Sequence, residues 1–208
     1  MPTLVIETAT AACSVALIAD GRVVARTHEL VGRGHAERLI PMIAELPDGG
    51  RAARVLVDCG PGSFTGIRVG IAAARGLALG WGVPVVGYSS LALVAAAALG
   101  ARPDLRRVAA VIEGGHGEVF MQAFDATLLP LGDLASLTPA AALARLDGVP
   151  AFGSGAARLL AVDPRLDATD MLPDAAQAWR LPNTRAALAP RPLYGRAPDA
   201  KVAGVAPR

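Results

Sequence analysis

Carboxylate and hydroxyl side chains at the end of the first apolar run are the first candidates for chemistry. The run TLVIET ends in Glu7 and Thr8, and a short polar turn that contains Thr10 follows it. A phosphate site at such a turn needs glycine, because a Cβ keeps the backbone N–H groups from closing on the anion. Residues 8–12 contain no glycine. We therefore interpret Glu7, Thr8 and Thr10 as structural residues rather than as a catalytic or metal-orienting group.

The histidines and cysteines do not form a metal-binding or nucleophilic pattern. No two of His28, His35 and His116 lie four residues apart, the spacing that places two imidazoles on one helix face. We interpret His35, at an expected helix start, as a capping or hydrogen-bonding residue. Cys13 and Cys59 lie in strand-like runs and are expected to be buried, reduced thiols. We predict no metal, no cofactor and no catalytic residue.

Residues 58–80, DCGPGSFTGIRVGIAAARGLALG, carry the strongest local signal. Gly60-Pro61-Gly62 predicts a tight turn from a strand into a helix capped by Ser63, and the open N–H groups of such a helix attract anions. Small residues recur at every fourth position on two sides of this helix: Gly66, Gly70 and Ala74 on one side, and Ala72, Gly76 and Gly80 on another. Each glycine inside a helix costs about 1 kcal/mol relative to alanine, so close approach of a neighbouring element is the expected offset. One side can lie on the protein's own sheet and the other on another subunit, or both can pack internally.

Composition indicates a folded chain with no strong charge. The 208 residues are 53% hydrophobic and 18% charged, which excludes a disordered chain and allows one sizeable domain or two small ones. A net charge of +2 and only 4% aromatic residues give no electrostatic footprint for nucleic acid.

The first half of the chain predicts three antiparallel strands followed by two further strands joined through helices. The expected strands are 3–8, 14–19, 22–30, 54–58 and 83–86, and the expected helices are 34–46, 63–81 and 90–99. Helical crossovers add strands in parallel with right-handed connections. This order is that of a ribonuclease-H-like unit.

The second half predicts a degraded copy of the same order after a boundary at residues 100–104. The expected strands are 107–113, 117–124, about 127–131 and 151–154, and the expected helices are about 138–147, 155–161 and 174–188. We therefore predict an α/β protein of two ribonuclease-H-like subdomains, each a mixed sheet flanked by helices. The predicted division is 1–102 and 103–208, the latter smaller and ending in an irregular tail from Pro190.

The N-terminus and the longest uncharged stretch both favour a cytoplasmic protein. The first residues have no basic segment and Glu7 interrupts their apolar run, so we expect no signal peptide. Residues 76–101 carry no charge and are long enough to span a bilayer. Glycines and Pro84 divide this stretch into a helix end, a strand and a new helix, so we expect no membrane segment.

The segment GPGSFTGIRVG resembles, almost letter for letter, the signature of the TsaB family, bacterial proteins of tRNA threonylcarbamoyladenosine biosynthesis. Four further segments resemble that family in the same order: LVIETA, SVAL (14–17), GHAERLIP (34–41) and PLYGRAPDAK (192–201). Three positions depart from its pattern. Glu7 replaces the usual aspartate, Ala36 replaces the usual serine, and EGGH (113–116) stands where the family tends to have Asp-Ala-Arg.

The resemblance implies two subdomains of the actin-like ATPase superfamily with no catalysis of their own. It further implies a scaffold that activates a threonylcarbamoyl transferase acting on adenosine 37 of tRNAs that read ANN codons. In that family the protein pairs with the catalytic subunit, and also with itself, through its first two helices. A small ATPase then docks on the pair, and the tRNA is contacted only indirectly.

We expect the first two helices to carry this interface as a symmetric helix bundle. The expected contact residues are Leu39, Ile43 and Leu46 on the first helix, and Phe64, Ile67, Arg68, Gly70, Ile71 and Ala74 on the second. Two other functions stay open. A small-molecule kinase of the same fold would need glycine turns in both opening hairpins, where the second half offers only Gly114, Gly115 and Gly117. A peptidase is a remote alternative, since no paired histidines or activated nucleophile support it.

Overall fold

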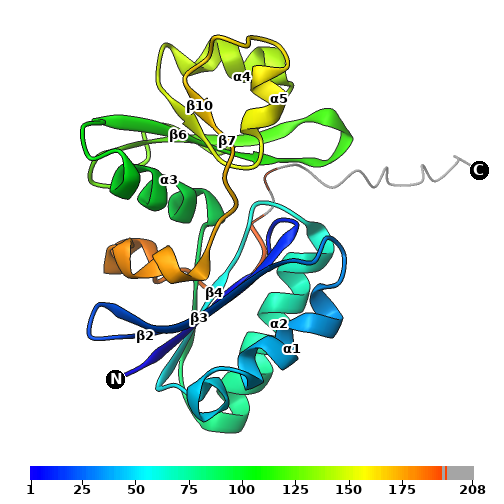
Figure 1. Cartoon of the computed structure of the whole chain (residues 1–208), viewed down its shortest axis with the longest axis vertical. Helices are drawn as coiled ribbons and strands as arrows, with labels where there is room; N and C mark the ends of the chain where they lie inside the picture. The colour runs from blue at the N-terminus through cyan, green and yellow to red at the C-terminus, as the bar shows by residue number, and fades with distance from the viewer. Residues whose placement is uncertain (194, 196–208) are drawn as a thin grey trace, which may run out of the picture.

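The computed structural model describes residues 1–193 and 195, arranged as two stacked mixed sheets with helices outside and between them (Figure 1). From bottom to top in Figure 1 the layers are α1 and α2, the first sheet, α3 with a C-terminal 3-10 segment, the second sheet, and α4 with α5. Residue 194 and residues 196–201 of the PLYGRAPDAK segment lie outside the described residues. Two subdomains of related topology are confirmed as the fold.

The first sheet has the strand order β3-β2-β1-β4-β5, as predicted. Its strands are β1 (Thr3–Glu7), β2 (Ala12–Ala19), β3 (Arg22–Leu30), β4 (Arg54–Asp58) and β5 (Val85–Tyr88). Strands β1, β2 and β3 pair antiparallel, while β4 and β5 join β1 in parallel. The helices are α1 (His35–Ala44), α2 (Phe64–Trp81) and α3 (Ser90–Ala101). Because parallel strands start from the same edge, β1 and β4 bring Glu7 and Asp58 to one end of the sheet.

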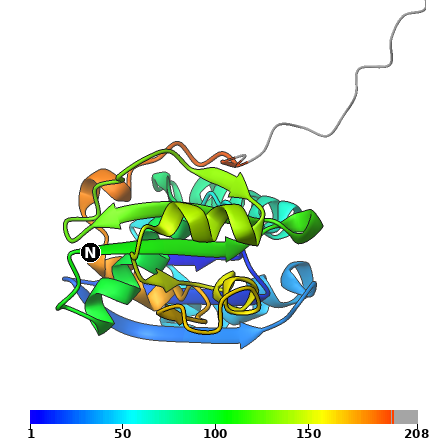
Figure 2. The same cartoon turned by 90° about the horizontal axis from the view of Figure 1, so that it is seen from above.

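The second sheet repeats this topology in the order β10-β9-β6-β7-β8. Its strands are β6 (Arg107–Glu113), β7 (Val119–Asp125), β8 (Ala135–Leu137), β9 (Ala151–Phe152) and β10 (Ala168–Thr169), and its helices are α4 (Pro139–Leu146) and α5 (Ala156–Leu160). In Figure 2, which looks down on this sheet, α4 lies over the green strands and the blue strands of the first sheet lie beneath.

Two predicted elements of the second half differ from the structure. Residues 126–128 form a turn, because the Asp125 carboxylate accepts hydrogen bonds from the N–H groups of Thr127 and Leu129, and Leu128 adopts a left-handed conformation. Residues 129–131 return beside the end of β7, but they form only an isolated bridge between Pro130 and Phe124 and not a full strand. The third strand is β8 instead. The predicted helix 174–188 is two short 3-10 segments, Ala175–Arg180 and Asn183–Arg185, because Pro182 cannot continue a helix between them.

The C-terminal segment returns to the first sheet. The Ser14 hydroxyl donates to Asp174 and accepts from the Ala175 N–H, and Gly87 in β5 exchanges two backbone hydrogen bonds with Leu188. The 3-10 segment Ala175–Arg180 packs with α3 in the apolar layer between the sheets. The two halves are therefore held together by a shared core and by chain that crosses back.

The two small-residue sides of α2 have different surroundings. A Cβ added at Gly66 would lie 2.1 Å from the Thr8 carbonyl oxygen, and one at Gly70 would lie 2.3 Å from Thr8 Oγ1. At Gly76 and Gly80 an added Cβ would meet nothing within 4 Å. The first side therefore lies against the protein's own β1, and the second faces outward.

Two matched glycine substitutions should move stability in opposite directions. Gly66→Ala forces a methyl group into a backbone oxygen and should lower the free energy of unfolding by about 1–3 kcal/mol. Gly76→Ala adds the same methyl group in open space and should raise it by up to about 1 kcal/mol. Urea denaturation of both variants measures the difference, and equal shifts of the same sign would contradict this account of α2.

Candidate functional site

The turn after β1 is seated against the start of α2. The Ser63 N–H donates to the Ala9 carbonyl at 2.7 Å, while the Ser63 side chain caps the helix by accepting from the Gly66 N–H. A Cβ added at Gly62 would lie 2.0 Å from the Ala9 carbonyl oxygen. Gly62, Gly66 and Gly70 of the signature are thus explained by contact of α2 and its preceding loop with residues 8 and 9, and Gly60 by its positive φ and its contact with Ile67.

Glu7 lies at the centre of a buried polar cluster at the carboxyl end of β1. Its Oε1 accepts from the Ala9 N–H at 2.9 Å, and the Ser90 hydroxyl at the start of α3 lies 3.0 Å from Oε2. The Tyr88 hydroxyl lies 3.1 Å from Oε2 and 3.0 Å from the Ile6 carbonyl oxygen. Glu7, Tyr88 and Ser90 are all fully buried. The carboxyl group therefore joins β1, β5 and α3.

The Tyr88 and Ser90 hydroxyl groups and the Ala9 N–H can all donate to the Glu7 carboxyl group. These hydrogen bonds act to lower the pKa of Glu7. Burial raises the pKa of Glu7 well above its ordinary value, and the nearby Asp58 carboxylate raises it further. Glu7 is thus a buried group that joins neighbouring elements of the fold.

Asp58 ends β4 beside Glu7 and is equally buried. Its Oδ1 accepts from the Thr8 N–H at 2.9 Å and lies 3.0 Å from Thr8 Oγ1, whereas Oδ2 has no hydrogen-bond partner among the described residues. Burial raises the pKa of Asp58 to about 7, against the opposing effect of the hydrogen bonds from Thr8. Two buried carboxyl groups at neighbouring strand ends cannot both ionise cheaply, so the pair holds at least one proton near neutral pH.

A cleft of about 690 Å³ opens between the two halves beside this cluster. Thr10, Ser63 and Phe64 line it from the first half, and Gly114 and Ser154 line it from the second. Arg33, Glu113 and Asp170 supply its charged side chains. Neither Glu7 nor Asp58 is among the lining residues, so neither carboxyl group reaches a molecule in this cleft.

His35, Cys13 and Cys59 are all buried. His35 is buried and its Nε2 lies 3.2 Å from the Ala12 carbonyl oxygen, which confirms the hydrogen-bonding interpretation. Cys13 and Cys59 are free and buried, and burial raises the pKa of Cys13 to about 12. Among residues 1–193 and 195, no three His, Cys, Asp or Glu side chains are grouped to hold a metal ion.

The structure corrects the side of the helices on which an interface was expected. Most of the expected contact residues lie in the core between the first sheet and its two helices: Leu39, Ile43, Leu46, Ile67, Gly70, Ile71 and Ala74. Apolar spacing identifies a face that is covered, and here the protein's own β1, β2 and β4 cover it. Only Phe64, which is 67% exposed, and the half-buried Arg68 stacked on its ring reach the surface.

The outward side of α2 continues from these two residues along the helix. We define the outer α2 face by its residues: Phe64, Arg68, Ala72, Gly76, Leu79 and Gly80. Leu79 is 85% exposed, and Ala72, Gly76 and Gly80 are exposed around it. Sequence spacing identified Ala72, Gly76 and Gly80 as one of two small-residue sides, but only the packing of α2 shows which side is open.

The chain is similar to known proteins over most of its length. The model of the family "TsaD: tRNA N6-adenosine threonylcarbamoyltransferase" matches residues 26–151, more than half of the chain. The solved structure of YeaZ from Pseudomonas aeruginosa is 31% identical, with a TM-score of 0.77, over 93% of this chain and 99% of that one. The tRNA threonylcarbamoyladenosine biosynthesis protein TsaB of Escherichia coli is 42% identical over 125 residues, and that of Haemophilus influenzae is 40% identical over 124. The chain belongs to the TsaB family.

The similarity to the curated TsaB proteins is concentrated in part of each chain. The aligned segment covers 58% of this chain and 53% of the E. coli protein, and 56% of this chain and 51% of the H. influenzae protein. This chain thus spans about half the length of these relatives, although the YeaZ structure is matched almost completely.

The Asp58 carboxyl group should make stability depend on pH. Its pKa of about 7 in the folded protein lies above the ordinary value of about 3.9 expected when unfolded. The folded state therefore binds more protons between these values, and the free energy of unfolding should fall as pH rises from about 4 to about 7.

Asp58→Asn should reduce this fall, because the amide stays neutral at every pH, while the part that comes from the raised pKa of Glu7 remains. Chemical denaturation at a series of pH values measures the slope. Asp48→Asn, at an exposed residue with a left-handed backbone that asparagine tolerates, is the matched control and should keep the parent slope. Parallel curves for the parent and Asp58→Asn would show that Asp58 is already ionised throughout this range.

Proposed function

We propose that this chain is a non-catalytic scaffold subunit of the assembly that forms N6-threonylcarbamoyladenosine at position 37 of tRNAs reading ANN codons. Membership of the TsaB family supports the pathway. The observation that carries the non-catalytic role is the burial of both strand-end carboxyl groups, since Glu7 and Asp58 are fully buried and accept hydrogen bonds from the backbone N–H groups of Ala9 and Thr8. Buried in this way, the two carboxyl groups do not contact a substrate, and in this proposal their role is structural.

The partners in this proposal are a catalytic threonylcarbamoyl transferase subunit, a small ATPase, and a second copy of the chain when it is alone. The outer α2 face is the surface that we assign to the transferase and to self-association. Its small residues allow another helix to approach closely, while Leu79 and Phe64 supply apolar area for a partner to bury. A two-fold dimer needs only such a self-complementary patch.

The proposed location is the cytoplasm, where tRNA modification takes place. None of the helices in the described part of the chain has both the length and the hydropathy required to cross a membrane.

Reconstitution of the modification reaction tests the proposed role. With transferase and ATPase subunits present, omission of this chain should abolish formation of the modified adenosine, measured by mass spectrometry of digested tRNA. The Glu7→Gln variant should restore it to within a few-fold of wild type, because glutamine keeps the shape of a neutral glutamic acid. A loss of several orders of magnitude in a folded Glu7→Gln variant would instead identify a catalytic carboxylate.

The same preparation separates the alternative functions. The isolated chain should not hydrolyse ATP above background, should carry no stoichiometric metal and should not cleave glycoprotein. Turnover of ATP that depends on a small-molecule acceptor would favour the kinase, and the proposed scaffold role would then fail.

A substitution on the outer α2 face tests the partner surface. Gly76→Leu adds a large side chain where the protein itself leaves open space, so the fold should persist while close approach of another helix is blocked. We expect both self-association and binding to the transferase subunit to weaken by at least tenfold in sedimentation experiments. Ala144→Leu, at an exposed position of α4, is the matched control and should leave both unchanged. Unchanged assembly of Gly76→Leu would place the interface on another surface.

A further inference from the structure

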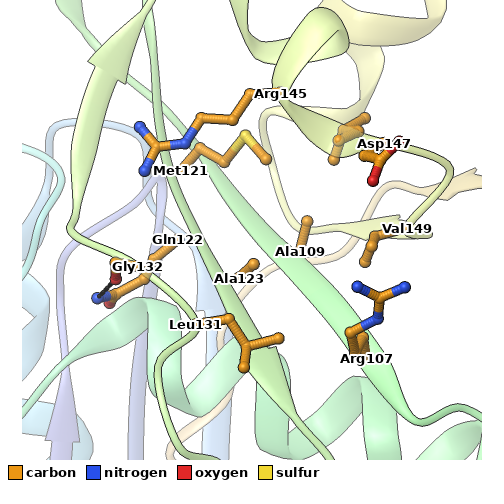
Figure 3. A pocket seen from close by; sticks show the side chains of 11 residues that line it. Arg107, Ala109, Met121, Gln122, Ala123, Leu131, Gly132, Arg145, Asp147 and Val149 are labelled. Atoms are coloured by element: carbon orange, nitrogen blue, oxygen red, sulfur yellow. Dashed lines mark hydrogen bonds between the residues drawn. The ribbon is translucent and has the colours of Figure 1, made fainter.

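The outer face of the second sheet contains a hollow that α4 and α5 leave uncovered (Figure 3). Its floor is formed by Ala109 in β6 and Ala123 in β7, which lie directly opposite each other in the register of the two strands. Two methyl side chains at a cross-strand pair leave space above the sheet. The resulting pocket has a volume of about 200 Å³.

The walls of the pocket are apolar and its position is set by the end of α4. Met121, Leu131 and Val149 form the walls. Helix α4 ends at Leu146, and Asp147 and Gly148 both take positive φ values, so the chain turns away before it covers the alanine floor. The pocket is therefore a consequence of where the helix stops.

Two arginine side chains stand on opposite sides of this pocket. Figure 3 shows the guanidinium groups of Arg107 and Arg145 on opposite sides of Ala109 and Ala123, with Arg145 extending toward the loop at Gly132. Arg145 donates one hydrogen bond, at 3.3 Å, to the carbonyl oxygen of Asp133, and Arg107 forms no ion pair with any described residue. A guanidinium has five N–H donors, so most donors of both groups remain available to a ligand.

The polar part of the rim is held in place by one loop. The Gln122 amide donates to the Gly132 carbonyl at 3.0 Å, next to the Asp133 carbonyl that holds Arg145. Asp147 is the only carboxylate among the lining residues that the structure describes. The site thus combines two cations, one anion and a small apolar floor.

We propose that this pocket binds a small phosphate monoester of the size of a ribose phosphate. Arg107 and Arg145 donate hydrogen bonds to the phosphate oxygens, since planar guanidinium groups match phosphate geometry and two of them balance a dianion. Asp147 accepts a hydrogen bond from a hydroxyl group of the ligand. The carbon skeleton lies on Ala109 and Ala123.

The volume of the pocket limits the size of the ligand that it can hold. About 200 Å³ corresponds to the space of roughly seven water molecules, below the range of about 300–1,000 Å³ in which drug-sized ligands bind. A phosphate group with one small sugar fits this space, whereas a whole dinucleotide does not. This ligand is not one that the proposed scaffold role requires, and the full chain alone is tested, so either proposal can fail without the other.

Titration of the full chain with ribose 5-phosphate, followed by calorimetry, tests the site. We expect saturable binding with a Kd in the millimolar range or tighter, weaker binding of inorganic phosphate and none of ribose. Arg107→Ala and Arg145→Ala should each weaken binding of ribose 5-phosphate by at least tenfold. Arg165→Ala, at a side chain that is 92% exposed and outside the pocket, is the matched control and should bind like the parent.

Filling the pocket provides an independent variant that removes no charge. Ala123→Leu places a large side chain on the floor and should abolish binding, with thermal unfolding used to show that the variant folds. The proposal is overturned if the parent shows no saturable binding, if both arginine variants bind like the parent, or if folded Ala123→Leu still binds. Binding of a short oligoribonucleotide without binding of ribose 5-phosphate also overturns it, because the site would then belong to a polymer.

Discussion

The close approach of α2 to the end of β1 is the contact on which the rest of this structure depends. It brings helix backbone within reach of Thr8 and Ala9, which only glycine at positions 62, 66 and 70 permits. The contact closes the turn that follows β1 and buries the two carboxyl groups beside it. At the same contact, the N-terminal cap of α2 and the hydrogen bond from the Ser63 N–H to the Ala9 carbonyl hold the helix in place.

Burial of Glu7 and Asp58 decides what these residues can do. A strand-end carboxylate in contact with water could bind a metal ion or a phosphate-bound metal. In this chain Glu7 is surrounded by Ala9, Tyr88 and Ser90, and Asp58 is held by Thr8, so both act within the protein. The raised pKa values of Glu7 and Asp58 follow from the same burial.

The two halves repeat one topology but differ in how their outer faces are covered. In the first half α1 and α2 cover the apolar face of β1, β2 and β4, and the buried apolar residues of both helices lie in that contact. Strand β3, at the edge of the sheet, stays largely exposed. In the second half the shorter α4 and α5 leave part of the sheet open above a pair of alanines. Surface available to other molecules therefore lies on the outside of α2 in one half and directly on the sheet in the other.

The sequence by itself determined the order of strands and helices in the first half, the cap at Ser63 and the family signature, because these depend on local periodicity, turn chemistry and glycine spacing. It also identified the two small-residue sides of α2. Only the tertiary structure decided which side is covered, because apolar spacing shows that a face is buried without showing what buries it. Local sequence patterns also could not show that Glu7 lies beside Asp58, Tyr88 and Ser90, because these residues are more than fifty positions away along the chain. Neighbours in space stabilise the two-residue strands β9 and β10 and the broken segment after Asp174. The residues of these elements therefore show little local pattern from which they could be predicted.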